Sequence, residues 1–105
     1  MAALHDFKAE LFKALGHPVR LRILELLNSG EKTVSELQMA LDIEASSVSQ
    51  QLAVMRARQL VDTRKSGSNV FYTVRDPVIF ELLASARQIF EHQVAKMNSL
   101  LDQEV

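Results

Sequence analysis

The sequence predicts a mostly α-helical fold that contains one small β-hairpin. Apolar residues recur at helical spacing in four consecutive segments and again in a long final segment. Between them, a run of β-branched and aromatic residues follows a polar turn. The 105 residues include only three glycines and two prolines, and 48% are hydrophobic. This composition fits a single folded domain spanning residues 1–105, in the order of four helices, two strands and one helix.

The first two helices are predicted from apolar spacing and from the residues between them. In residues 4–15 the apolar positions follow one helical face, with charged residues on the other. Gly16 suits the end of this helix, and Pro18 suits the first turn of the next. The second helix is expected in "VRLRILELLN", with Val19, Ile23, Leu24 and Leu27 turned inward.

Residues 33–59 read as a helix-turn-helix. Thr33 and Glu36 have the spacing of a capping box, which starts a short helix over "VSELQMAL". After the tight connection "DIEA", a further helix begins near Ala45 and continues through "SSVSQQLAVMRARQL". Its apolar residues Val48, Leu52 and Met55 share one face. Two helices joined by such a short connection are typical of this motif.

The other face of that second helix carries side chains suited to reading DNA. Ser46, Ser49 and Gln50 lie there, and its first two turns lack lysine and glutamate. Glutamine can pair with adenine through two hydrogen bonds, and serine can meet base edges or phosphates. A free helix N-terminus also attracts phosphate. The alternative is an ordinary surface helix, for which the absence of charge is unusual.

The predicted hairpin, over residues 61–74, places a polar tip between two positively charged neighbours. Arg64 and Lys65 lead into a four-residue "SGSN" turn, and the strand after it runs through residues 70–74. Residues 46–75 carry a net charge of +4, although the whole chain carries −1. Such a tip can lie along phosphates beside a groove, as the wing of a DNA-binding domain does. Chance clustering of charge is the alternative interpretation.

The last predicted helix, residues 76–101, has an apolar stripe some six turns long. Asp76 suits its N-cap and Pro77 its first turn. The stripe is longer than the small domain beside it can cover, so it predicts pairing with a second copy of the chain. The alternative is that the chain's own first helix covers it. Its apolar positions are Ile79, Leu82, Leu83, Ala86, Ile89, Phe90, Val94, Met97, Leu100 and Leu101.

Three segments together resemble the ArsR family of metal-sensing repressors: "KALGHPVRLRILELL", "TVSELQMALDIEASSVSQQLAVMRARQLV" and "RKSGSNVFYTVRD". The resemblance covers residues 7–90. It implies a winged helix-turn-helix homodimer, formed by the first and last helices, that binds double-stranded operator DNA. Combined with the charge pattern, it gives a predicted DNA-binding set of Ala45, Ser46, Ser47, Ser49, Gln50, Gln51, Arg56, Arg64, Lys65, Ser66, Ser68 and Asn69.

The effector sites that the resemblance implies are incomplete. A Cys-x-Cys pair of the family matches Thr33 and Ser35, and the chain has no cysteine. A second family site, on the last helices, keeps Asp76 and His92 but has Val78 and Ile89 in place of two histidines. A different site for Ni²⁺ or Zn²⁺, at the dimer interface where the first and last helices should lie together, is the remaining metal hypothesis, because imidazole and carboxylate suit these ions. Its candidate ligands are His5, Asp6, Glu10 and His92.

Two further classes of function are alternatives to a DNA-binding repressor. One is a winged-helix protein-interaction subunit that needs a partner for effector sensing or DNA binding, which the negative net charge favours. The other is an enzyme, which the sequence disfavours because it has no Gly-rich phosphate loop, His-Glu-x-x-His motif or Ser-His-Asp grouping. Without a membrane-length apolar run or a cleavable signal, we expect a soluble, cytoplasmic protein.

Overall fold

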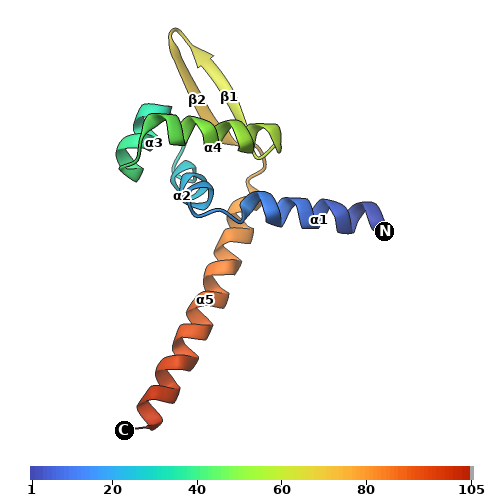
Figure 1. Ribbon diagram of the computed structural model, residues 1–105, viewed down its shortest axis with the longest axis vertical. Helices are drawn as coiled ribbons and strands as arrows, with labels where there is room; N and C mark the ends of the chain where they lie inside the picture. Colours follow the sequence, from blue (N-terminus) through green and yellow to red (C-terminus); the bar gives the residue numbers. More distant parts are fainter. Residues whose placement is uncertain (105) are drawn as a thin grey trace.

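The computed structural model describes residues 1–104 and shows helices and strands in the predicted order (Figure 1). The mostly helical fold class with one hairpin is confirmed. Strands β1 (Val61–Ser66) and β2 (Asn69–Val74) pair antiparallel, with Val61 opposite Val74 and Ser66 opposite Asn69. The helices are α1 (Ala2–Leu15), α2 (Pro18–Leu27), α3 (Val34–Leu41), α4 (Ala45–Ala57) and α5 (Val78–Gln103).

The hydrophobic core lies between α2, α3 and α4, and it is closed by the base of the hairpin and the start of α5. Its members come from the inward faces that the apolar spacing predicts. Full burial of one valine, leucine, isoleucine or methionine side chain stabilises the fold by roughly 1.5–3 kcal/mol. The side chains with less than 2% exposure are Ile23, Leu24, Leu37, Val48, Leu52, Met55 and Val61.

Helices α1 and α5 project away from this core in different directions (Figure 1). The radius of gyration is 16.9 Å, whereas a compact domain of this length has about 13 Å. Phe7 on α1 is 64% exposed and Phe90 on α5 is 62% exposed. The alternative in which α1 covers the stripe of α5 is therefore wrong for a single chain. No helix within residues 1–104 is long and apolar enough to cross a membrane.

Two predicted boundaries were wrong, and in both cases a left-handed residue sets the observed one. Helix α4 ends at Ala57 and does not reach Leu60, because Gln59 adopts a φ of 62° and stops the helix. The hairpin turn has two residues, not four. Gly67 has a φ of 61°, and a glycine with positive φ at the first position suits a two-residue turn.

The N-cap of α5 is Pro77 and not Asp76, so the helix starts one residue later than predicted, but Asp76 still accepts a hydrogen bond from its first turn. The Val78 N–H donates to Oδ1 of Asp76 at 3.0 Å. The capping box of α3 is also present: the Thr33 N–H donates to Oε1 of Glu36 at 3.0 Å, and the Glu36 N–H donates to Oγ1 of Thr33 at 3.2 Å. These contacts are local in sequence, which is why residue spacing predicts them.

Replacing Thr33 with alanine is expected to lower the free energy of unfolding by about 0.5–2 kcal/mol, since one side of the capping box is lost. Urea denaturation at fixed protein concentration measures this change. Ser35→Ala is the matched control, because Ser35 is exposed in the first turn of the same helix. Equal losses in the two variants would contradict a stabilising role for the capping box.

Candidate nucleic-acid interface

Helix α4 presents a continuous polar face because its apolar face is fixed in the core. Val48, Leu52 and Met55 are each 0% exposed. The N-cap residue Glu44 makes no side-chain capping hydrogen bond, so among the described residues no side chain caps the first amides of α4. Their N–H groups remain able to donate hydrogen bonds to a phosphate. The exposed residues of the first two turns are Ala45, Ser46, Ser47, Ser49 and Gln50.

Gln51 differs from its predicted neighbours on this helix. It is half-buried, and its Oε1 atom is enclosed without a hydrogen-bond partner within residues 1–104. Helical geometry places it beside Val48 and Met55, on the side that meets the rest of the protein. The exposed polar face of α4 therefore centres on Ser46, Ser49 and Gln50, with Gln51 beneath it.

A shallow hollow of about 470 Å³ lies between α4 and the hairpin. Tyr72 of β2 forms one wall, and Ser49 and Arg56 of α4 contribute polar groups to the other. The hairpin rises from α4 to a free tip (Figure 1). The tip residues Ser66, Ser68 and Asn69 are all exposed. The helix face, the hollow and the tip together offer hydrogen-bonding groups at different heights above one helix.

Three of the five cations in residues 46–75 are held in ion pairs, which sequence alone did not indicate. Arg58, just after α4, pairs with Glu10 of α1; Arg64 of β1 pairs with Glu31; Arg75 pairs with Asp62 at 3.1 Å. The hydrogen bond from Arg58 holds the pKa of Glu10 below its usual value, and that from Arg64 does the same to the pKa of Glu31.

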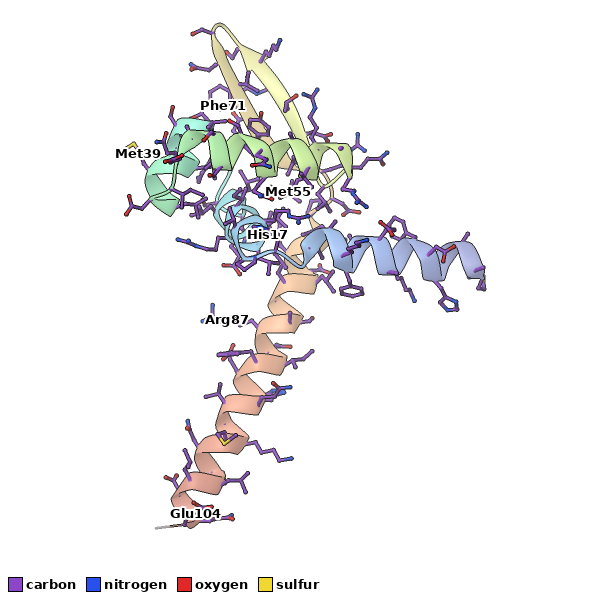
Figure 2. The ribbon with its side chains drawn as sticks, viewed as in Figure 1. His17, Met39, Met55, Phe71, Arg87 and Glu104 are labelled. Atoms are coloured by element: carbon purple, nitrogen blue, oxygen red, sulfur yellow. The ribbon has the colours of Figure 1, made fainter. Side chains whose placement is uncertain are left out.

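Within residues 1–104, no ion pair involves the remaining two cations of that region, Arg56 and Lys65. Both are exposed, one at the end of α4 and one on β1 near the tip. Figure 2 labels Met55 on the same helix and Phe71 on the same hairpin. Arg56 and Lys65 are therefore the cations best placed to meet phosphates. Lys32 is a third, which the sequence analysis missed because it lies outside the motif. Its backbone pairs with Tyr72 of β2, which places it beside the hairpin.

The comparisons with known proteins agree with this geometry. Residues 17–63, which span α2 to the start of β1, match the family described as "Bacterial regulatory protein, arsR family". An HTH-type transcriptional regulator of Mycobacterium tuberculosis, Rv0081, is 40% identical over 100 residues, covering 94% of this chain and 88% of the relative. The chain belongs to the ArsR family. It is a DNA-binding transcriptional regulator, a class without enzymatic activity.

Two solved structures extend the likeness to three dimensions. The crystal structure of Rv0081 superposes with a TM-score of 0.80 at 41% identity, covering 89% of this chain and 94% of that one. The homodimeric winged helix-turn-helix DNA-binding domain Mb0332 of Mycobacterium bovis has a TM-score of 0.79 at 29% identity, covering 89% of this chain and 86% of that one.

A further relative by sequence is the biofilm growth-associated repressor of Agrobacterium fabrum. It is 39% identical over 82 residues, covering 78% of this chain and 70% of the relative.

The predicted metal ligands of this ArsR-family regulator do not come together in one chain. Residues 1–104 contain no group of three or more His, Cys, Asp or Glu side chains placed to hold a metal ion. His5 and Glu10 lie on α1 and His92 lies on α5, and the two helices diverge (Figure 1). Glu10 is also engaged by Arg58. The donor set therefore does not fit a metal site within one chain.

The two family sites do not fit a metal either. Thr33 uses its hydroxyl in the capping box of α3, and neither it nor Ser35 can replace a thiolate for a soft ion. Asp76 uses one carboxylate oxygen to cap the start of α5. The residues of one chain therefore do not indicate that this regulator responds to a metal.

If a second chain does not complete the site, we expect calorimetric titration of Ni²⁺ or Zn²⁺ to give the same heats for the wild type and for His92→Ala, because one chain alone does not bring the predicted ligands together. His5→Ala serves as the parallel variant on the other helix. A heat that depends on both His5 and His92 would contradict this expectation. It would mean that a second chain completes a shared site, as the sequence-based hypothesis requires.

Proposed function

We propose that this regulator acts as a homodimeric repressor that inserts α4 of each chain into the major groove of an operator. The observation that carries the proposal is the exposed polar face of α4 beside a hairpin with a polar tip. An α-helix fits the major groove, and short side chains allow its backbone to approach the bases closely. Serine and glutamine provide both donors and acceptors there.

The roles of the individual side chains follow from their positions. Ser46, Ser49 and Gln50 lie on the outward face of α4 and would contact base edges. Arg56 and Lys65, the cations without an ion pair in residues 1–104, would contact phosphates on either side. Ala45 and Ser47, at the start of α4, would lie near the sugar-phosphate backbone of the DNA. The tip residues Ser66, Ser68 and Asn69 would lie along the phosphates of a neighbouring DNA strand.

A second copy of the chain is the partner that we propose for the exposed faces of α1 and α5. Two-fold pairing would bury the apolar stripe and set the two α4 helices about 34 Å apart, the spacing of successive major grooves. The similarity to a homodimeric winged-helix domain supports this arrangement. The large apolar residues exposed on α5 are Val78, Ile89, Phe90, Val94, Met97, Leu100 and Leu101.

Repression would follow from occupancy of the operator, because the bound dimer excludes the transcription machinery from the same DNA. The regulator would act in the cytoplasm. Relatives named as repressors support this direction. The competing function is a protein-interaction subunit that binds DNA only with a partner or co-regulator. The pairing of three cations near α4 and the wing is the observation that favours it.

Replacing Gln50 with alanine is expected to reduce the preference for the operator over unrelated DNA by about 1–3 kcal/mol, because a base contact is lost. Lys65→Ala is expected to weaken binding to all sequences and to flatten the slope of log K against log salt by about 0.9. Fluorescence anisotropy at several salt concentrations measures both changes. Uniformly weak binding of the wild type to every duplex would instead favour the protein-interaction subunit.

Replacing Met97 with glutamate is expected to give monomers and to weaken operator binding, since a charge would be placed within the exposed apolar stripe of α5. Light scattering coupled to gel filtration measures the mass. Ala95→Glu is the matched control, because it adds the same charge to the opposite side of the same exposed helix. A dimer that survives Met97→Glu would contradict pairing through this face.

A further inference from the structure

We propose that Glu31 is a positioning residue for the wing, the hairpin of β1 and β2: it holds Arg64 across β2 and so fastens the hairpin to the loop between α2 and α3. This inference rests on the proposed function, in which the wing contacts phosphates beside the groove. It assigns Arg64 a structural task inside the protein, whereas the sequence predicted that Arg64 contacts DNA. It also assigns a task to Glu31, which no sequence motif singled out.

The loop that carries Glu31 is shaped to lie alongside β2. Gly30 adopts a φ of 133°, a region that favours glycine, so the chain can turn back after α2. Lys32, two residues later, then pairs with Tyr72 as in an antiparallel sheet. The Tyr72 N–H donates to the carbonyl of Lys32 at 2.8 Å, and the Lys32 N–H donates to the carbonyl of Tyr72 at 3.2 Å. Glu31 is thereby held next to the outer edge of β2.

Arg64 reaches that edge by lying over its cross-strand partner. Arg64 of β1 stands opposite Phe71 of β2. Its guanidinium carbon is 4.7 Å from the centre of the Phe71 ring, within the range of a cation–π contact. Beyond the ring, Nε of Arg64 donates to one oxygen of Glu31 at 3.1 Å, and Nη2 donates to the other oxygen. One side chain therefore links β1, β2 and the loop.

The geometry of this pair differs from that of an ordinary surface ion pair. A single contact between exposed charges contributes little, but a two-pronged arginine–carboxylate pair restricts orientation as well as distance. The stacking on Phe71 further restricts the guanidinium. Only arginine can provide both, since lysine is a single point charge. The conformation of the wing is therefore tied to these three side chains.

The pair also decides which wing cation is available to DNA. The side chain of Glu31 is 37% exposed and neutralises the charge of Arg64. Lys65, the next residue, points from the opposite face of β1, as adjacent residues of a strand do, and no ion pair within residues 1–104 involves it. On this basis Arg64 positions the wing and Lys65 meets the phosphate. Two adjacent cations in the sequence thus have different tasks.

The first experiment measures the mobility of the wing in the free protein. The chain has no cysteine, so a nitroxide attached to the Ser68→Cys variant reports on the tip alone. We expect Glu31→Gln, Arg64→Gln and Arg64→Lys each to narrow the lines of the electron paramagnetic resonance spectrum, which reports greater mobility of the label. The double variant Glu31→Gln/Arg64→Gln should be no more mobile than either single one, because both break the same contact. Lys65→Gln is the matched control and should resemble the wild type.

Three results would overturn the proposal. The label could be as mobile in Glu31→Gln as in the wild type, or as mobile in Arg64→Lys as in the wild type. The third is an increase in mobility in the double variant that equals the sum of the increases in Glu31→Gln and Arg64→Gln. Thermal unfolding of each variant shows whether the domain as a whole remains folded. A loss of order confined to the label, with unchanged melting, is the expected signature of a local positioning contact.

The second experiment measures operator binding. A wing ordered for only a third to a tenth of the time predicts about threefold to tenfold weaker binding for Arg64→Lys, although the charge is kept. Arg87→Lys, the same exchange in an exposed ion pair on α5, should bind as the wild type does. Wild-type affinity in Arg64→Lys would overturn the positioning role. If the wild type itself binds no duplex, the proposed function fails, while the label on the free protein still tests the contact of Glu31 with Arg64.

Discussion

The structure depends on the burial of one face of α4. Val48, Leu52 and Met55 fill the space between α2 and α3, and their complete burial fixes the rotation of the helix about its own axis. Because that rotation is fixed, Ser46, Ser49 and Gln50 cannot turn away from solvent. The exposed polar face of α4 is thus a consequence of core packing: no polar residue of α4 has to be held in place by a contact of its own.

A second constraint acts on the charges around this interface. Positive side chains gather where a polyanion is expected to bind, and in the absence of DNA they would repel one another. The fold pairs three of them with carboxylates: Glu10 on α1, Glu31 in the α2–α3 loop, and Asp62 on β1. The first two pairs, between residues distant in sequence, join the end of α4 and the hairpin to the rest of the domain, and the third lies at the base of the hairpin itself. The net charge of a segment therefore overstates the charge available to DNA.

The order of elements and the core were predictable from the sequence because they follow local rules. Apolar spacing identifies Val48, Leu52 and Met55, and the spacing of Thr33 and Glu36 identifies the start of α3. Contacts between distant residues were not predictable: Arg58 and Glu10 are 48 positions apart, and Arg64 and Glu31 are 33 apart. The left-handed conformation of Gln59, which ends α4 early, also has no local signal, because glutamine rarely adopts it. Enclosure of the Gln51 side chain depends on neighbours that only the fold supplies.

The uncovered side of α5 has a consequence for how much of this protein a cell must hold. Exposed apolar surface on an isolated helix favours proteolysis and aggregation. Newly made copies are therefore protected when they dimerise soon after synthesis. By mass action, the fraction of copies protected in a dimer falls as the concentration of the protein falls. A gene controlled by such a molecule would respond to its dose with a threshold, set by the meeting of two chains.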